Sequence, residues 1–303
     1  MSRPILVGYT ATDAGADAVA LGARLAAATG RELAIVVVLP AEDRSVITPP
    51  DSGYDRYLHD QATAWLAAAQ ATIPDATSRT THVRYGESFA AGLIDAAEEL
   101  EASLIVVGAA NGGIRGRHRL GTVATELLHS SPVPVALAPE GSRRLDPAIG
   151  ITRVTAAVGT RPGAEALLEA STGLAAAAGA ELRLLSLVSV DLPAGVETGA
   201  IRVVGAAHAG EVLTQALAAL PDQIEAEVVV ADGDSIEEAV SGIGWEPGEL
   251  AVVGSSRLAQ QRRLFLGSTA AKMLHELPVP MIVVPRTLAG TVASGQAQKE
   301  EPR

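Results

Sequence analysis

The sequence contains no cysteine among its 303 residues. Disulfide bonds, cysteine-ligated zinc, iron–sulfur clusters and thiol catalysis are therefore excluded. Aromatic residues make up only 3% of the chain, too few for the aromatic platform on which single-strand binders stack bases. The core must instead consist of Val, Leu, Ile and Ala, and the hydrophobic content of 48% fits a globular protein.

Basic residues are scarce relative to acidic ones. The 23 Lys and Arg residues face 35 Asp and Glu residues, which gives a net charge of −12. Nucleic acids and anionic membranes require a basic face, so we expect neither as a partner. No apolar stretch approaches the ~20 residues of a membrane helix, and the apolar run at residues 5–9 is short for a secretory signal. We therefore expect a cytoplasmic protein.

Catalytic signatures are also missing. The six histidines show no metal-ligand spacing, and the chain has neither a nucleophile elbow nor a Walker-type phosphate loop. No residue stands out as a general base or nucleophile. We expect no metal site built by the protein and no enzyme with fast turnover, while slow nucleotide hydrolysis stays open.

The chain repeats itself at a spacing of 146 residues. The recurring features are Gly108 and Gly254, Gly121 and Gly267, His129 and His275, and the Pro-Val-Pro runs at 132–134 and 278–280. A repeat of this length indicates a duplicated domain rather than a solenoid unit. We expect one domain at residues 1–145 and a second at 146–287, joined near a Gly- and Pro-containing linker. The tail at 288–303 lacks periodicity and is expected to be disordered.

Each half alternates apolar runs with helical patterns. In the first half the runs at residues 5–10, 33–39, 80–85, 104–107 and 133–138 predict strands, and Gly30 is a plausible helix stop. Asp234-Ser235-Ile236-Glu237 has the form of a capping box. Near-continuous apolar strands that alternate with helices predict an α/β fold, a parallel sheet covered on both faces. Ligands of such sheets bind beyond the carboxyl ends of the strands.

One constellation in each half suits an anion. A predicted strand ends at Gly108, and after a loop Gly121-Thr122 opens a helix; Gly254 and Gly267-Ser268 repeat this arrangement. Glycines allow close backbone approach, and the first amides of a helix favour a phosphate. The loops are basic against an acidic background and supply the phosphate-contact candidates Arg115, Arg117, Arg119, Arg257, Arg262 and Arg263. The alternative is that the glycines only turn the chain and that the arginines are solvated.

These residues resemble the glycine signature of the universal stress protein family: Gly, two residues, Gly, nine residues, then Gly with Ser or Thr. Both frames keep the outer elements, and Asn111 or Arg257 replaces the middle Gly. The resemblance covers residues 3–286. It implies two tandem doubly wound parallel five-stranded sheets of the adenine-nucleotide-binding (HUP-like) type, with strand order 3-2-1-4-5. It also implies that the two final strands meet within the chain as an intramolecular pseudo-dimer, with a homodimer as a further possible assembly.

The resemblance further implies a stress-response protein that binds ATP or another adenine nucleotide, with Mg²⁺ as a candidate companion. The glycine loops would hold phosphates and ribose. The adenine side corresponds to Thr10, Val38, Val158 and Leu187, where Thr10 and Val158 replace the family's usual Asp. Because Asn tolerates a positive φ better than Arg, we expect tighter binding in the first half. Two alternatives stay open: a degenerate member that acts through unknown protein partners without a nucleotide, and a nucleotide-dependent enzyme of the same superfold.

Overall fold

The structure is a computed structural model, and it describes residues 3–41, 52–110, 120–159, 164–189, 199–221, 223–256 and 263–286. In the first half the elements are β1 (Ile5–Gly8), α1 (Asp13–Thr29), β2 (Leu33–Pro40), α2 (Ser52–Gln70), β3 (Arg79–Gly86), α3 (Phe89–Glu99), β4 (Leu104–Gly108), α4 (Thr122–Ser130) and β5 (Val135–Ala138). Two short 3₁₀ turns, η1 (Ser142–Arg144) and η2 (Pro147–Ile149), lead into the second half. There the elements are β6 (Arg153–Ala157), α5 (Ala164–Ala178), β7 (Glu181–Ser189), α6 (Gly199–Ala218), β8 (Ala226–Gly233), α7 (Ile236–Ser241), β9 (Glu249–Gly254), α8 (Ser268–Glu276) and β10 (Met281–Val284).

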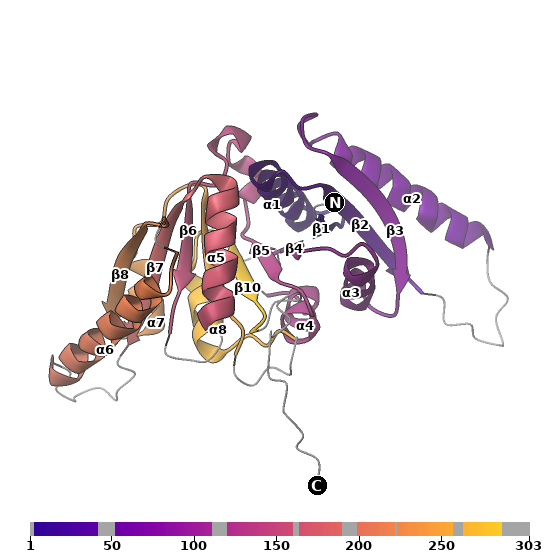
Figure 1. The fold of residues 1–303 in the computed structure, drawn as a ribbon. Helices are drawn as coiled ribbons and strands as arrows, with labels where there is room; N and C mark the ends of the chain where they lie inside the picture. Colours follow the sequence, from indigo (N-terminus) through magenta and orange to yellow (C-terminus); the bar gives the residue numbers. More distant parts are fainter. Residues whose placement is uncertain are drawn as a thin grey trace, which may run out of the picture.

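The described strands form one ten-stranded sheet in the order β3-β2-β1-β4-β5-β10-β9-β6-β7-β8. Each half therefore has the expected order 3-2-1-4-5 with parallel pairing, and the expected α/β fold is confirmed. The two five-stranded sheets are not separate, because β5 and β10 pair antiparallel with Val135 opposite Val283. The final strands thus meet across a pseudo-two-fold axis, as predicted. The edge strands β3 and β8 lie at opposite ends of the molecule (Figure 1).

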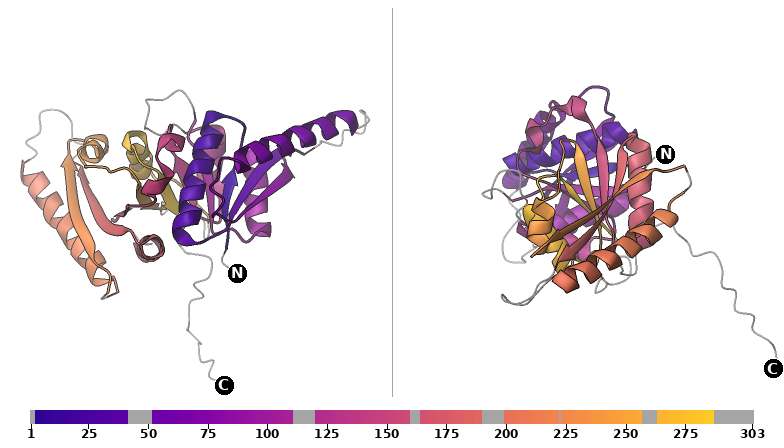
Figure 2. Two further views of the ribbon diagram at one scale, coloured as in Figure 1. Left: turned by 90° about the horizontal axis from the view of Figure 1, so that it is seen from above. Right: turned by 90° about the vertical axis from the view of Figure 1, so that its left-hand side faces the viewer.

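Two apolar cores sandwich this sheet. One face is covered by α1, α2, α5 and α6, which contribute Val19, Leu66, Leu167 and Leu213. The other face is covered by α3, α4, α7 and α8, which contribute Leu93, Leu127, Val240 and Leu274. Figure 2 shows the two halves side by side along the sheet. Because the sheet is continuous, each core runs through both halves.

Helix ends follow local signals closely, with one shift. Gly30 ends α1 at a φ of 63°, as its sequence position predicts. The capping box of α7 lies one residue later than expected: Ser235 is the N-cap and its hydroxyl accepts from the amide of Glu238. The carboxylate of Glu238 in turn accepts from the amide of Asp234. The prediction that began the box at Asp234 was therefore wrong by one residue, since adjacent Asp and Ser are both good caps.

The linker after β5 folds back onto α1. The carboxylate of Asp17, which is 1% exposed, accepts from the amides of Gly141 and Arg143 at 2.9 and 2.8 Å and from the Arg143 guanidinium at 2.9 Å. Gly141 takes a φ of 93°, which favours glycine. The buried charge of Asp17 is thus balanced by one linker segment, which fixes the path from the first half to the second.

A second buried charge pair lies inside the second half. The Arg183 guanidinium bonds to the Glu249 carboxylate, and both side chains are almost fully buried. The hydroxyl of Thr155 donates to Glu249 at 2.5 Å, and Arg183 lies 5.1 Å from the ring centre of Trp245. Each charge therefore has several polar partners, which a buried ion pair requires.

Candidate nucleotide site

The two glycine frames place uncapped helix starts beside strand ends. β4 and β9 end at Gly108 and Gly254, and Gly121 and Gly267 are the N-caps of α4 and α8. Neither glycine offers a side-chain cap, whereas the hydroxyls of Thr12, Ser88 and Ser235 cap α1, α3 and α7. The first amides of α4 and α8 therefore keep donors that a bound anion could satisfy.

The bases of the two loops are built alike. A methyl group added at Gly121 would lie 3.3 Å from Cβ of Ala110, and one added at Gly267 would lie 3.3 Å from Cβ of Ser256. Both glycines thus let the start of the helix pack closely against the chain that leaves the strand. The common sequence spacing of the two frames produces a common local geometry.

Helix α1 packs against the start of the first-half frame. A methyl group at Gly108 would overlap the carbonyl oxygen of Ala14, so the first turn of α1 abuts the end of β4. Thr10 belongs to the same turn: its hydroxyl lies 3.0 Å from that of Thr12. Val38 is buried against α3, because Cβ at Gly92 would lie 2.5 Å from its Cγ1. Val38 is therefore a packing residue here, whereas Thr10 is exposed.

The second-half frame opens onto a cleft of about 420 Å³ at the carboxyl ends of β6, β7 and β9. Four predicted residues line it: Val158, Leu187, Gly254 and Gly267. No described atom lies within 4 Å of a methyl group added at Gly254. The residue that corresponds to Ala14 in the second half is Pro162, which lies outside the described residues, so the two frames can be compared at Gly121 and Gly267 but not at Gly108 and Gly254. The expectation of tighter binding in the first half stays a prediction.

The cleft is lined mainly by apolar residues, with several polar groups among them. Its polar lining comes from Ser186, His208, Ser255, Ser256 and Thr269. The described lining contains no Asp or Glu. An apolar wall with a small number of hydrogen-bonding groups is the usual composition of a small-molecule pocket. A flat heterocycle fits such a wall, and the hydroxyls can orient it.

The remaining predicted residues are either exposed or outside the described residues. Thr122 and Ser268 open α4 and α8 and are exposed, and Arg263 is exposed as well. Asn111, Arg115, Arg117, Arg119, Arg257 and Arg262 lie outside the described residues. The phosphate role of the basic loops therefore stays a prediction.

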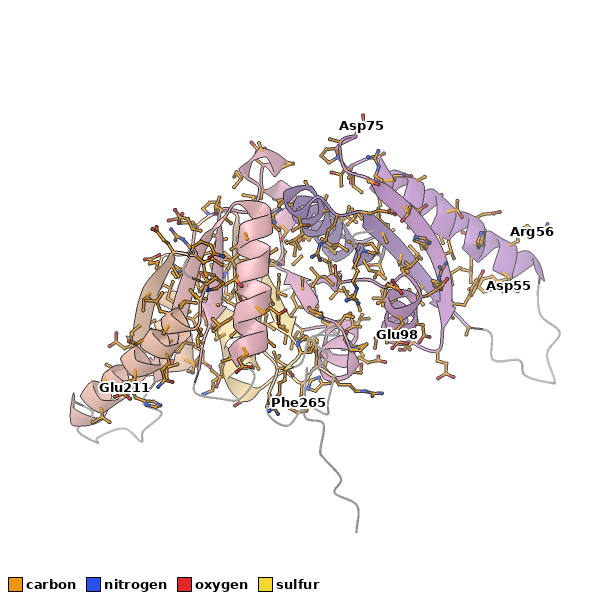
Figure 3. All side chains as sticks on the ribbon, viewed as in Figure 1. Asp55, Arg56, Asp75, Glu98, Glu211 and Phe265 are labelled. Carbon is orange, nitrogen blue, oxygen red and sulfur yellow. The ribbon has the colours of Figure 1, made fainter. Side chains whose placement is uncertain are left out.

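The sequence did not indicate that the first half supports the cleft of the second. The segment that leads into α8 is hydrogen-bonded to the first half: the amides of Leu264 and Leu266 donate to the carbonyls of Ser131 and Leu128 at 2.9 and 3.2 Å. The ring of Phe265, labelled in Figure 3, stacks edge-on against His129 at 4.8 Å. The amide of Phe265 donates to the Ser255 hydroxyl at 2.8 Å. Helix α4 of one half thus supports the cleft of the other, an arrangement that exists only because β5 and β10 pair.

Two further observations concern metal binding and membrane spanning in the described part of the chain. There, no group of three or more His, Asp or Glu side chains could hold a metal ion. No helix within the described ranges is long and apolar enough to cross a membrane.

Comparison with known proteins identifies the family. The sequence model of the Universal stress protein family matches residues 1–139 and again residues 150–285. The chain is a tandem member of the universal stress protein family. Universal stress proteins of Mycobacterium tuberculosis and Mycobacterium bovis are each 29% identical to it over 297 residues, which cover 93% of this chain and 99% of the relative. Among solved structures, a universal stress protein from Archaeoglobus fulgidus has a TM-score of 0.58 at 17% identity, covering 95% of this chain and 100% of the other.

Proposed function

We propose that this universal stress protein binds an adenine nucleotide, with ATP as the ligand to test, in the cleft of its second half. The observation that carries the proposal is the 420 Å³ cleft that brings Val158, Leu187, Gly254 and Gly267 to one place. Nucleotide binding is also what the family resemblance implies. The proposed role is that of a stress-response protein that binds its ligand without fast turnover.

The chemistry of the cleft suits the two ends of a nucleotide at different places. The apolar residues Val158 and Leu187 suit an adenine ring, while the uncapped amides of α8 beyond Gly267 suit phosphate oxygens. The basic residues Arg257, Arg262 and Arg263 flank this helix in sequence and would add charge-assisted hydrogen bonds.

The composition of the cleft limits what it can do chemically. Without an acid in the described lining, Mg²⁺ would be held through the phosphates rather than by a protein carboxylate. His208 is the one titratable side chain among the described lining residues. The carboxylate of Glu211 lies 3.9 Å from its imidazole but outside the described lining, an arrangement that supports binding rather than rapid hydrolysis.

Isothermal titration calorimetry with ATP tests the proposal directly. Gly267→Val should abolish the binding heat or weaken it more than ten-fold, because the branched side chain covers the first amides of α8. Gly121→Val is the matched control, since its neighbour Ala110 stands at the same 3.3 Å as Ser256 does in the second half. Loss of heat only with Gly121→Val would move the site to the first half. No heat with the unmodified chain would reject nucleotide binding.

A second candidate function is a partner-binding stress protein that holds no nucleotide. It is favoured by Thr10 and Val158, which stand where the family usually has an Asp, and by the absence of any acid in the described cleft lining. The small molecules released when the purified protein is denatured separate the two candidates. ATP or AMP in the supernatant supports the nucleotide site, and an empty protein that also gives no ATP heat supports the second function. Accumulation of ADP during incubation would instead indicate a nucleotide-dependent enzyme.

A further inference from the structure

A second cavity lies where the two halves meet, and it shares no described lining residue with the nucleotide cleft. It has a volume of about 360 Å³ and lies between α1 and α5, which pack near each other (Figure 1). Its floor is the sheet surface on both sides of the β5–β10 junction, with Leu104 on one side and Ile282 on the other. We call this cavity the junction groove.

Much of the lining of the junction groove is apolar, and one of its residues on α5 has no side chain. Leu25 of α1 and Leu174 of α5 form apolar walls, but Gly173 of α5 contributes none. A methyl group added at Gly173 would meet no described atom within 4 Å. A glycine inside a helix lowers helix stability relative to other residues, and here it leaves an open apolar channel.

One end of the junction groove is cationic. Arg3 and Arg31 line it where β1 and β2 begin, together with Ser103 before β4. The Arg31 guanidinium donates to the Ser103 hydroxyl at 2.7 Å, and none of the described ion pairs gives it a carboxylate partner. The neighbouring Glu32 accepts instead from the hydroxyl of Thr80 at 2.8 Å. Glu169 of α5 is the one acidic side chain in the described lining, and no described ion pair joins it to Arg31.

We propose that the junction groove binds a single-chain amphiphile with an anionic headgroup, such as a medium-chain carboxylate. The alkyl chain lies along Leu25, Gly173 and Ile282, and the carboxylate takes the position beside Arg31 and Ser103. A guanidinium whose present partner is a neutral hydroxyl gains a stronger hydrogen bond from a carboxylate. The volume lies within the usual range of small-ligand pockets, roughly 300–1,000 Å³.

Calorimetry with octanoate, decanoate and dodecanoate below their micelle concentrations tests the apolar part. Affinity should rise about four-fold per added methylene, which is the fold-change equivalent to ~0.8 kcal/mol for each buried CH₂. Dodecanol and dodecyltrimethylammonium test the charge, and both should bind at least ten-fold more weakly than dodecanoate. Equal binding of all three dodecyl compounds would overturn the assignment of the cationic end.

Two pairs of variants locate the site. Gly173→Leu fills the groove without a steric conflict at Cβ and should abolish dodecanoate binding, whereas Gly210→Leu on α6, which is equally free at Cβ and outside the groove, should leave it unchanged. Arg31→Gln should weaken binding about ten-fold, whereas Arg144→Gln, an exposed arginine of η1, should not. Thermal unfolding of each variant shows whether the fold is retained.

Other occupants give distinct results. No dodecanoate heat with the unmodified chain, or unchanged heat with Gly173→Leu, would overturn the proposal. Displacement of dodecanoate by a peptide of residues 287–303, or an apparent affinity that falls as the protein concentration rises, would assign the groove to the chain's own tail or to a second copy. Co-flotation with anionic phospholipid vesicles that Gly173→Leu abolishes would assign it to a bilayer surface. ATP titrations of the same variants should be unaffected, so the two sites are tested independently.

Discussion

Replacing Gly108 by alanine should destabilise the fold. Gly108 ends β4 and does not need a positive φ, so alanine is acceptable to the backbone there. The new methyl group, however, would overlap the carbonyl oxygen of Ala14 in the first turn of α1.

The magnitude follows from this overlap. The obstacle is helix backbone, which cannot turn away as a side chain can, so α1 must shift against β4. Such overpacking costs about 1–3 kcal/mol of unfolding free energy.

Urea unfolding followed by circular dichroism measures this loss through the midpoint at a constant m-value. The same variant titrated with ATP should bind it as the unmodified chain does, because the proposed site lies in the second half. A midpoint equal to that of the unmodified chain would refute the close packing of α1 against β4.

Three further perturbations test other parts of the fold by urea unfolding. Glu249→Ala should lower the unfolding free energy by about 3–5 kcal/mol because it leaves the Arg183 charge buried without its carboxylate, and Arg183→Met in the same chain should restore part of the loss. Val283→Asp should destabilise the chain by several kcal/mol, since it buries a charge at the β5–β10 junction opposite Val135. Burial, and then the Arg84 charge, lower the pKa of His82 below its usual 6.5, so the unfolded chain binds the proton more readily. The stability that His82 contributes is complete above about pH 6.5 and declines as the pH falls below that value toward the lowered pKa of the folded state. His82→Gln should remove this part of the pH dependence of the unfolding free energy.

Each of these has a contrary outcome. A Glu249→Ala chain as stable as the Glu249→Ala, Arg183→Met chain would mean that the isolated guanidinium costs nothing. Unchanged unfolding of Val283→Asp would mean that the two halves do not depend on the β5–β10 pairing. Identical pH profiles for His82→Gln and the unmodified chain would assign the acid sensitivity to the carboxylates.

The parts of the fold that follow from local patterns could be predicted from the sequence. Alternating apolar runs and helices gave the α/β class, Gly30 gave the end of α1, and the duplicated glycine frames gave the corresponding positions of β4 and β9. The shift of the capping box from Asp234 to Ser235 shows the limit of local signals, because both residues can cap. These features depend on a few neighbours in the chain, which a sequence displays directly.

The tertiary surroundings of the two sites could not be predicted in this way. The expectation of a better first-half site rests on Asn111 and its backbone freedom, a property of one loop, and it stays a prediction. The contact between Gly108 and Ala14 joins residues that lie far apart in the sequence. The support of the second cleft by His129 and Phe265 likewise depends on the meeting of two halves. Such contacts are set by tertiary packing and leave no periodicity or spacing in the sequence.

The antiparallel junction of β5 and β10 also has a consequence for how the two halves can change over time. In a homodimer of separate chains, one gene encodes both copies, so any substitution appears in both sites, and dilution separates the partners. Here the partners are linked covalently, their local concentration stays high at any dilution, and each half has its own codons. One half can therefore change at its own site while its other contacts, such as that of His129 with Phe265, continue to support the second half.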